Sequence, residues 1–165
     1  LYTGLRDHSV RGAKWKEIDF LKKEWTVPGS RMKSGREHKV PLPRLGIAAL
    51  KKLEPVTFKT EEDFIFSAKT KRGYIAENTL RLALHRLGFK VTVHGFRSLI
   101  TDVLNENGFN RDAIERQLDH QENSQVRKAY LRSDFLNERR RMMEWFANWC
   151  EGKHQTTKVI QLRGN

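Results

Sequence analysis

Six residues of this chain have side chains that suit attack on a phosphodiester, and they follow one another as Arg6, Lys33, His94, Arg97, His120 and Tyr130. An arginine clamps phosphate oxygens with a planar fork that is always charged. A lysine or a histidine can give a proton to a leaving alkoxide. A tyrosine can form a covalent intermediate. The ordered set, rather than any one member, predicts this chemistry.

Each member also has a plainer explanation when taken alone. His94 and Arg97 share a face at the start of a predicted helix, where free N–H groups favour phosphate, but a surface histidine and a helix arginine fit the same spacing. Lys33 fits an ordinary basic turn as well as a mobile lysine that projects into a groove. His120 could donate to a phosphate oxygen or lie at the surface. Tyr130 has basic neighbours that favour its phenolate, but a tyrosine in a short helix is more often packing.

The length and charge of the chain set limits on its class. At 165 residues it is expected to form one domain, with at most a tail. Its net charge is +12, with a pI near 10.1. A surface of this sign suits a polyanion, with nucleic acid as the first candidate and a generally basic soluble protein as the alternative. No long apolar run is present, which excludes a membrane-spanning helix.

Cysteine usage and the first residue add two expectations. Cys150 is the single cysteine, so an internal disulfide is impossible, which suits a reducing cytoplasm. Cys150 and His154 have no second ligand pair at a suitable spacing, so no zinc site is predicted. The chain opens on Leu1 with no signal peptide, and we expect it to be part of a longer protein.

Local patterns predict the elements that position these side chains. Short apolar or β-branched runs, separated by Pro-Gly and Ser-Gly breakers, predict a three-stranded antiparallel sheet with strands at 18–21, 25–27 and 38–42. Helical spacing of apolar residues predicts helices at 9–15, 43–53, 77–87, 94–108, 110–118, 124–130 and 133–150. Asn110 and Ser133 are the expected N-caps. Residues 54–75 are predicted to be mostly loop with a buried anchor at 64–66. The predicted fold class is mainly α with a small three-stranded antiparallel sheet.

The order of these residues resembles the tyrosine recombinases, and most closely the integrases of bacteriophages and bacterial genomic islands. The resemblance spans nearly all of residues 1–150, and several separate phrases carry it: 11–15, 31–33, 40–42, 77–80 and 139–143. It implies the tyrosine recombinase catalytic fold, a DNA breaking-rejoining fold, for residues 1–151. Residues 152–165 would be a polar tail, either disordered or paired with a neighbour. The family's upstream DNA-binding domains have no counterpart in this chain.

The resemblance also implies a mechanism. Three side chains would bind the scissile phosphate, namely those of Arg6, Arg97 and His120. Lys33 would protonate the 5′ hydroxyl leaving group, and His94 would assist proton transfer and phosphate binding. Tyr130 would attack the phosphate and leave a 3′-phosphotyrosyl link. Neither a metal nor another cofactor would be needed, because the covalent link keeps the phosphodiester energy.

The family's partners and setting follow from the same resemblance. The implied substrate is double-stranded DNA, cut and rejoined during integration or excision of a phage or other mobile element. The longer protein would assemble as a tetramer on two DNA sites, whereas this chain would be a monomer. Accessory DNA-bending or excision proteins would join it at the nucleoid in the bacterial cytoplasm, with no membrane involved.

One residue departs from the family pattern. Family members usually carry an acid three positions after the first arginine, where this chain has Ser9; Asp7 or Asp119 could take its place. This departure keeps a non-catalytic DNA-binding or assembly module open as an alternative function. Relaxation of DNA in the manner of a type IB topoisomerase is the alternative within enzymes. Phe146 is expected in the core, while Trp145 and Trp149 could contact a neighbouring protomer or complete the chain's own core.

Overall fold

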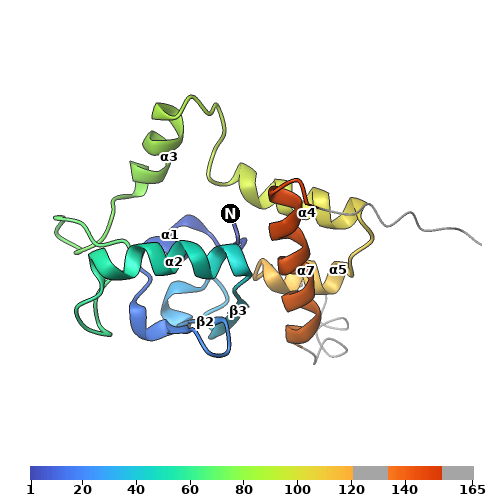
Figure 1. The fold of residues 1–165 in the computed structure, drawn as a ribbon, viewed down its shortest axis with the longest axis horizontal. Coiled ribbons are helices and arrows are strands. Elements are labelled where there is room, and N and C mark those ends of the chain that lie inside the picture. The colour runs from blue at the N-terminus through green and yellow to red at the C-terminus, as the bar shows by residue number, and fades with distance from the viewer. Residues whose placement is uncertain (121–133, 154–165) are drawn as a thin grey trace, which may run out of the picture.

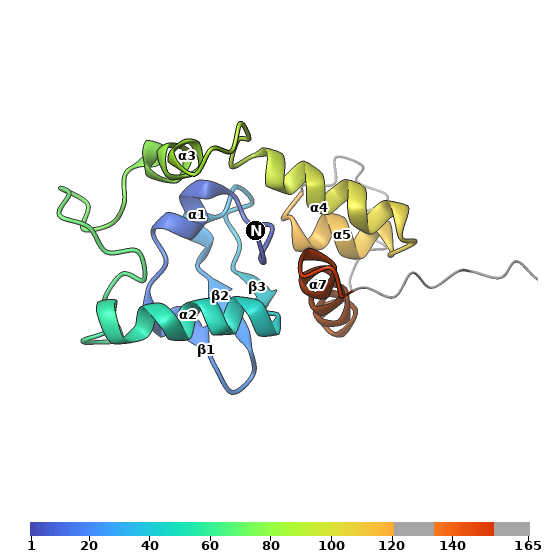
Figure 2. The same cartoon turned by 45° about the horizontal axis from the view of Figure 1, so that its top comes forward.

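The computed structural model describes residues 1–120 and 134–153, whose elements form two packed groups (Figures 1 and 2). The first group contains a three-stranded sheet with the helices α1 (Asp7–Arg11) and α2 (Arg44–Thr57). The second contains α4 (Gly95–Glu106), α5 (Arg111–Gln117) and α7 (Leu136–Cys150). The predicted fold class, mainly α with a small antiparallel sheet, is confirmed.

The sheet has the order β1-β2-β3 and is antiparallel throughout. Its strands are β1 (Ile18–Asp19), β2 (Glu24–Val27) and β3 (His38–Pro41). Val27 lies opposite His38 in the register, so the predicted hairpin of β2 and β3 is present. β1 is shorter than predicted because the chain turns after residue 19, and Lys23 in that turn has a positive φ of 54°.

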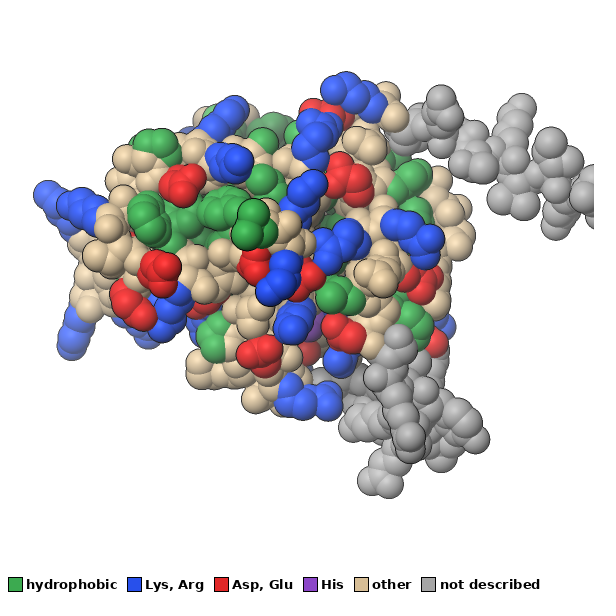
Figure 3. All heavy atoms as spheres, turned by 60° about the horizontal axis from the view of Figure 1, so that its bottom comes forward, with side chains coloured by type: hydrophobic (Ala, Val, Ile, Leu, Met, Phe, Trp, Pro, Cys, Tyr) green, Lys and Arg blue, Asp and Glu red, His purple; other side chains and the backbone are tan. Residues whose placement is uncertain are grey.

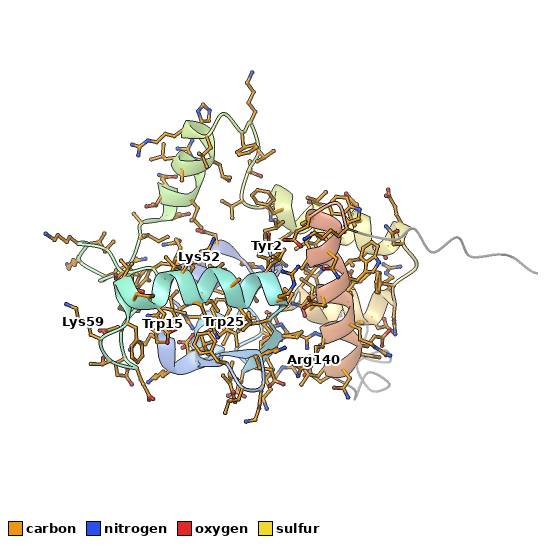
Figure 4. The ribbon with its side chains drawn as sticks, viewed as in Figure 1. Tyr2, Trp15, Trp25, Lys52, Lys59 and Arg140 are labelled. Atoms are coloured by element: carbon orange, nitrogen blue, oxygen red, sulfur yellow. The ribbon has the colours of Figure 1, made fainter. Side chains whose placement is uncertain are left out.

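Trp15 and Trp25 fill the core between the sheet and α2, as Figure 4 shows. The helix predicted at 9–15 is α1, which begins two residues earlier and already ends at Arg11, and Trp15 begins a separate short 3₁₀ helix, Trp15–Glu17. The predicted loop anchor is confirmed, since Ile65 is buried and its N–H donates to the carbonyl of Ala13 at 2.9 Å. The anchor attaches the long connection after α2 to this core.

The structure extends α2 four residues past its predicted end, through Pro55 to Thr57. A proline inside a helix removes one backbone hydrogen bond and crowds the preceding turn. Here it lies in the last turn, where the N–H of Phe58 still donates to Glu54 and the hydroxyl of Thr57 donates to Leu53. The cost is therefore confined to one turn.

The second core lies among α4, α5 and α7, where apolar side chains at helical spacing are fully buried: Ile100, Leu104, Ile114, Leu118, Met142 and Phe146. Trp145 packs on Phe109 with ring centroids 5.0 Å apart, and Trp149 stacks on Phe146 at 5.8 Å. Both tryptophans therefore complete the core of their own chain.

The starts of α5 and α7 differ in how well they were predicted. The side chain of Asn110 accepts a hydrogen bond from the N–H of Asp112 at 2.9 Å, so the predicted cap of α5 is confirmed. The start of α7 was predicted wrongly: the helix begins at Leu136, after Phe135 in a left-handed conformation with φ 50°. Ser133 and the helix predicted at 124–130 lie outside the described residues.

α3 (Glu77–Arg86) stands apart from α2 in both views (Figures 1 and 2). Its apolar residues are not buried: Leu80 and Leu84 are only partly covered, and Leu87 beyond it is 71% exposed. The helix forms where the spacing predicts it, but α1 is its main packing partner. Its apolar side chains are therefore only partly covered by the described residues.

The first residues of the chain lie between the two groups (Figure 2). The side chain of Gln117 donates to the carbonyl of Thr3 at 2.8 Å. Arg139 and Arg140 of α7 reach the sheet, where they donate to Lys39 and to Glu24. Among the described residues, none of the helices is both long and apolar enough to cross a bilayer.

Candidate active site

Arg97 is buried and held at both ends of its guanidinium. It lies in the first turn of α4, on the side of that helix whose apolar residues are buried in the second core. Nη1 donates to the carbonyl of Gly4, and Nη2 donates to the carbonyl of Leu118 at 2.8 Å. Burial, and then the nearby charge of Arg6, lower its pKa to about 10. The side chain therefore stays cationic at neutral pH and has a fixed orientation.

Arg6 is the second guanidinium of the site. It is the N-cap residue of α1, with an extended backbone, and its side chain is 28% exposed. Arg6 contacts Asp119, the residue after Leu118, whose carbonyl accepts from Arg97, so both guanidiniums lie near the same short segment. Two adjacent guanidiniums repel one another unless an anion lies nearby, so this pair suits a phosphate.

Asp119 is the acid beside these two arginines. One of its carboxylate oxygens lies 3.5 Å from Nη1 of Arg6, and its charge also favours the cationic form of Arg97. The residue is buried and has a left-handed backbone with φ 51°, which aspartate tolerates better than most residues. Asp7, the other candidate, pairs with Arg11 at 2.7 Å instead.

Ser9, which stands where the family usually has an acid, contacts a different partner. Its hydroxyl donates to the carbonyl of Arg31 at 2.8 Å, and Ser9 itself is buried. Arg31 ends a short 3₁₀ helix, Gly29–Arg31, in the connection between β2 and β3. The hydrogen bond therefore ties α1 to the loop that carries Lys33.

Lys33 lies on that connection, exposed to solvent, as the sequence predicts for a turn between two strands. The loop turns at Gly35, whose φ is 69° and whose N–H donates to the carbonyl of Met32. Glu17 receives a hydrogen bond from Arg31 and anchors the base of the loop. Lys33 therefore lies on a loop that hydrogen bonds hold in place.

The two histidines of the predicted set lie at the ends of helices. His94 is exposed just before α4, where its carbonyl accepts from the N–H of Arg97 at 2.9 Å, and the hydroxyl of Thr92 accepts from the N–H of Gly95 at 3.0 Å. His120 follows Asp119, and its Nδ1 lies 2.7 Å from a carboxylate oxygen of Glu115. That contact orients the ring and leaves Nε2 to face other partners.

The structure thus brings together Arg6 and Arg97, adds Asp119, and places His120 next in the chain. Lys33 and His94 are exposed on separate elements. Tyr130 lies outside the described residues.

Sequence reasoning missed a buried polar group behind this site. Gln117 and Arg139 have no exposed surface, and His38 is 3% exposed. Burial and the charge of Arg139 lower the pKa of His38 to about 4, so its ring is neutral. A signal was available: Gln117 lies on the apolar face of α5 with Ile114, and a polar residue on such a face must find a partner inside.

Neither surface charge nor the apolar hollow beside Arg97 identifies the site by itself. Figure 3 shows lysine and arginine side chains spread over one face among acidic ones. An apolar hollow of about 210 Å³ lies between α2 and α4, and Arg97 forms part of its wall. Its lining is mainly aliphatic and aromatic, which does not suit a phosphate. In the described part of the chain, no three acidic, histidine or cysteine side chains gather to hold a metal ion.

Comparison with known proteins gives a consistent result. The model of the phage integrase family matches residues 1–137. The chain is 41% identical to prophage integrase IntA of Escherichia coli over 163 residues, which are 97% of this chain and 39% of that protein. It is 35% identical to the integrase of Shigella phage Sf6 over 155 residues, which are 92% of this chain and 40% of that protein. The chain spans about two fifths of the length of these curated relatives.

A solved structure supports the fold. The integrase of mycobacterium phage Brujita superposes with a TM-score of 0.66 at 20% identity, over 87% of this chain and 47% of that one. At this level of identity, the likeness concerns the arrangement of the elements.

Proposed function

The chain belongs to the phage integrase family, and we propose that it is the catalytic domain of a site-specific DNA recombinase. The observation that carries the proposal is a pair of guanidiniums, of which Arg97 is held by hydrogen bonds to two carbonyls and Arg6 lies 3.5 Å from a carboxylate oxygen of Asp119. Residues 1–151 would form this domain and residues 152–165 a polar tail.

In the proposed reaction, Arg6, Arg97 and His120 bind the scissile phosphate of double-stranded DNA. The phenol oxygen of Tyr130 forms a bond to phosphorus, and the bond from phosphorus to the 5′ oxygen breaks. Lys33 gives the leaving oxygen a proton, and His94 assists proton transfer. The reverse attack by a 5′ hydroxyl rejoins the strand, so no external energy source is consumed.

The electrostatic argument explains why the arginines must be fixed in place. Negative charge builds up on the non-bridging oxygens in the transition state, and donors that are already oriented stabilise it without reorganising. Removal of one such donor typically costs about 10²–10³ in rate. A positioned acid contributes about 10²–10⁴. The hydrogen bonds from Arg97 to Gly4 and Leu118 supply the fixed orientation that this argument requires.

The proposal extends to partners by way of the family. A longer protein containing this domain would act on two DNA sites as a tetramer, with accessory DNA-bending or excision proteins, at the nucleoid of a bacterial cell. The isolated chain would be a monomer that binds DNA weakly. Its affinity would fall steeply with salt, because phosphate contacts release counterions.

The direct test is Tyr130→Phe on a nicked substrate that traps the covalent intermediate. Wild-type protein should give a band of protein-linked DNA on a denaturing gel. The variant should give none, while a filter-binding assay shows similar affinity for the same duplex. A covalent adduct formed by Tyr130→Phe would rule out Tyr130 as the nucleophile. Absence of an adduct with the wild type, despite binding, would favour a non-catalytic DNA-binding module.

A further inference from the structure

The two carbonyls that hold Arg97 come from distant parts of the chain. Gly4 belongs to the segment before α1, and Leu118 follows the last residue of α5. A guanidinium fork can use both acceptors only if the two segments keep a fixed spacing. Some contact between these segments must therefore set that spacing.

Gln117 provides that contact. Its side-chain Nε2 donates to the carbonyl of Thr3 at 2.8 Å, one residue before Gly4. Along the backbone it directly precedes Leu118. One side chain thus links the two segments at positions adjacent to the acceptors of Arg97.

The orientation of Gln117 is itself determined by buried partners. Its Oε1 accepts from Nε of Arg139 at 2.9 Å, which directs the amide nitrogen toward Thr3. Its backbone carbonyl accepts from Nε2 of His38 at 3.2 Å. Gln117 and Arg139 are both fully buried, where an unpaired amide or guanidinium would be costly. The amide therefore has one satisfied orientation.

We propose that Gln117 is a positioning residue for Arg97, and that Arg139 sets the orientation of Gln117. The proposal rests on the proposed role of Arg97 as a phosphate ligand. Gln117 keeps the carbonyls of Gly4 and Leu118 at the spacing that the guanidinium needs. A misplacement of about 1 Å at a reacting group can cost about 10²-fold in rate, even when the cause is remote.

Two variants of Gln117 and a matched pair in α7 test this arrangement. Gln117→Glu keeps the acceptor for Arg139. Its second carboxylate oxygen, which cannot donate, would face the carbonyl of Thr3. Gln117→Met removes both hydrogen bonds at similar volume. Arg139→Met removes the partner of Gln117. Arg140→Met is the control, because this neighbouring arginine, labelled in Figure 4, donates instead to the carbonyl of Lys22 in the turn before β2 and to Glu24 of β2.

The first measurement compares cleavage of two trapping substrates, one with a phosphodiester and one with a methylphosphonate at the scissile position. The methylphosphonate is neutral, so a well-placed cation stabilises its transition state less than that of the charged phosphodiester. Wild-type protein should prefer the phosphodiester, and Arg97→Ala should reduce that preference. We expect Gln117→Glu, Gln117→Met and Arg139→Met to reduce it about 10- to 100-fold. Arg140→Met should keep the wild-type ratio, and a general loss of folded protein would lower both rates equally.

The second measurement needs no DNA. The guanidinium N–H signals of Arg97, assigned by their loss in Arg97→Lys, should exchange slowly with solvent in the wild type and faster in Gln117→Glu. Wild-type exchange together with a wild-type substrate ratio in both Gln117 variants would overturn the inference. If the wild-type protein forms no adduct at all, the proposed function fails, while the exchange rates still decide whether Gln117 positions Arg97.

Discussion

Asp119 is the acid that lies beside Arg6 in the structure. The acid expected three residues after Arg6 is replaced by Ser9, which binds the loop between β2 and β3. Asp119 supplies the negative charge from the other side of the site, next to His120. A serine at that position is therefore compatible with an oriented Arg6.

We predict that Asp119→Asn and Asp119→Gly both slow cleavage but differ in their free energy of unfolding. Both remove the charge beside Arg6, so both should slow cleavage by about 10-fold or more, as expected for loss of a charged contact in a preorganised site. Glycine at φ 51° removes the cost of a left-handed backbone, about 1 kcal/mol, and should offset the lost ion pair. Single-turnover cleavage and urea unfolding would check this. Unchanged cleavage in both variants would mean that Asp119 does not orient Arg6.

His38 predicts a pH-dependent stability. Its pKa is about 4 in the folded chain and about 6.5 when unfolded, so the unfolded state binds the proton first as the pH falls. Stability should be full above pH 6.5 and should fall between pH 6.5 and 4. The total loss is about 3 kcal/mol, because each pKa unit corresponds to about 1.4 kcal/mol.

Urea unfolding of His38→Gln at pH 7 and pH 4.5 measures this contribution. Glutamine can still donate to the carbonyl of Gln117 but does not titrate, so the variant should lose less stability than the wild type on acidification. His85→Gln, at an exposed position on α3, is the matched control and should behave as the wild type does. An equal loss of unfolding free energy between pH 7 and pH 4.5 in His38→Gln and in the wild type would show that His38 is not the source of the pH dependence.

At the scale of elements, the local sequence predicted most helices and strands but not how deeply they are buried. The stripe of α4 fills the second core, whereas the similar stripe of α3 faces mostly solvent. Periodicity reports that a helix has an apolar face, not whether another element covers it. The start of α7 was missed for a related reason, since Phe135 ends the preceding segment in a left-handed conformation that no capping pattern predicts.

The cap of α5 gives a prediction at this scale. Asn110→Ala removes the acceptor for the N–H of Asp112 and should destabilise the protein by about 1 kcal/mol. Asn110→Ser keeps an acceptor and should lose only a few tenths of that. Because α5 ends at Gln117, the alanine variant should also weaken the contact to Thr3. Equal unfolding midpoints for the two variants would show that the cap contributes little.

At the scale of the whole molecule, the site lies where the two groups of elements meet. The acceptors of Arg97 belong to the N-terminal segment and to the end of α5, and Arg139 joins α7 to β3. Gly4 allows this approach, because its φ is 66° and a Cβ would lie 2.8 Å from a methyl carbon of Leu118. The junction therefore depends on a residue without a side chain.

We predict that Gly4→Ala destabilises the protein by about 1–3 kcal/mol, from backbone strain together with the clash. Gly108→Ala is the matched control, since its φ is 74° but nothing lies within 4 Å of the added carbon. It should show the backbone cost alone. Thermal unfolding of both variants measures the difference in stability between them. An equal loss of stability would show that the side chain of Leu118 moves aside without a measurable energetic cost.

The sequence by itself determined the fold class, the sheet, most helices and the ordered set of chemical residues, because those follow from residue types and from local spacing. Tertiary structure alone decided that Asp119 lies beside Arg6, that α3 is exposed, and that Gln117 contacts both Arg139 and the segment before Gly4. The reason is physical: the hydrogen bond from Arg97 to Gly4 joins residues 93 apart. A contact of that kind exists only once separate elements have packed, and no local pattern encodes its geometry.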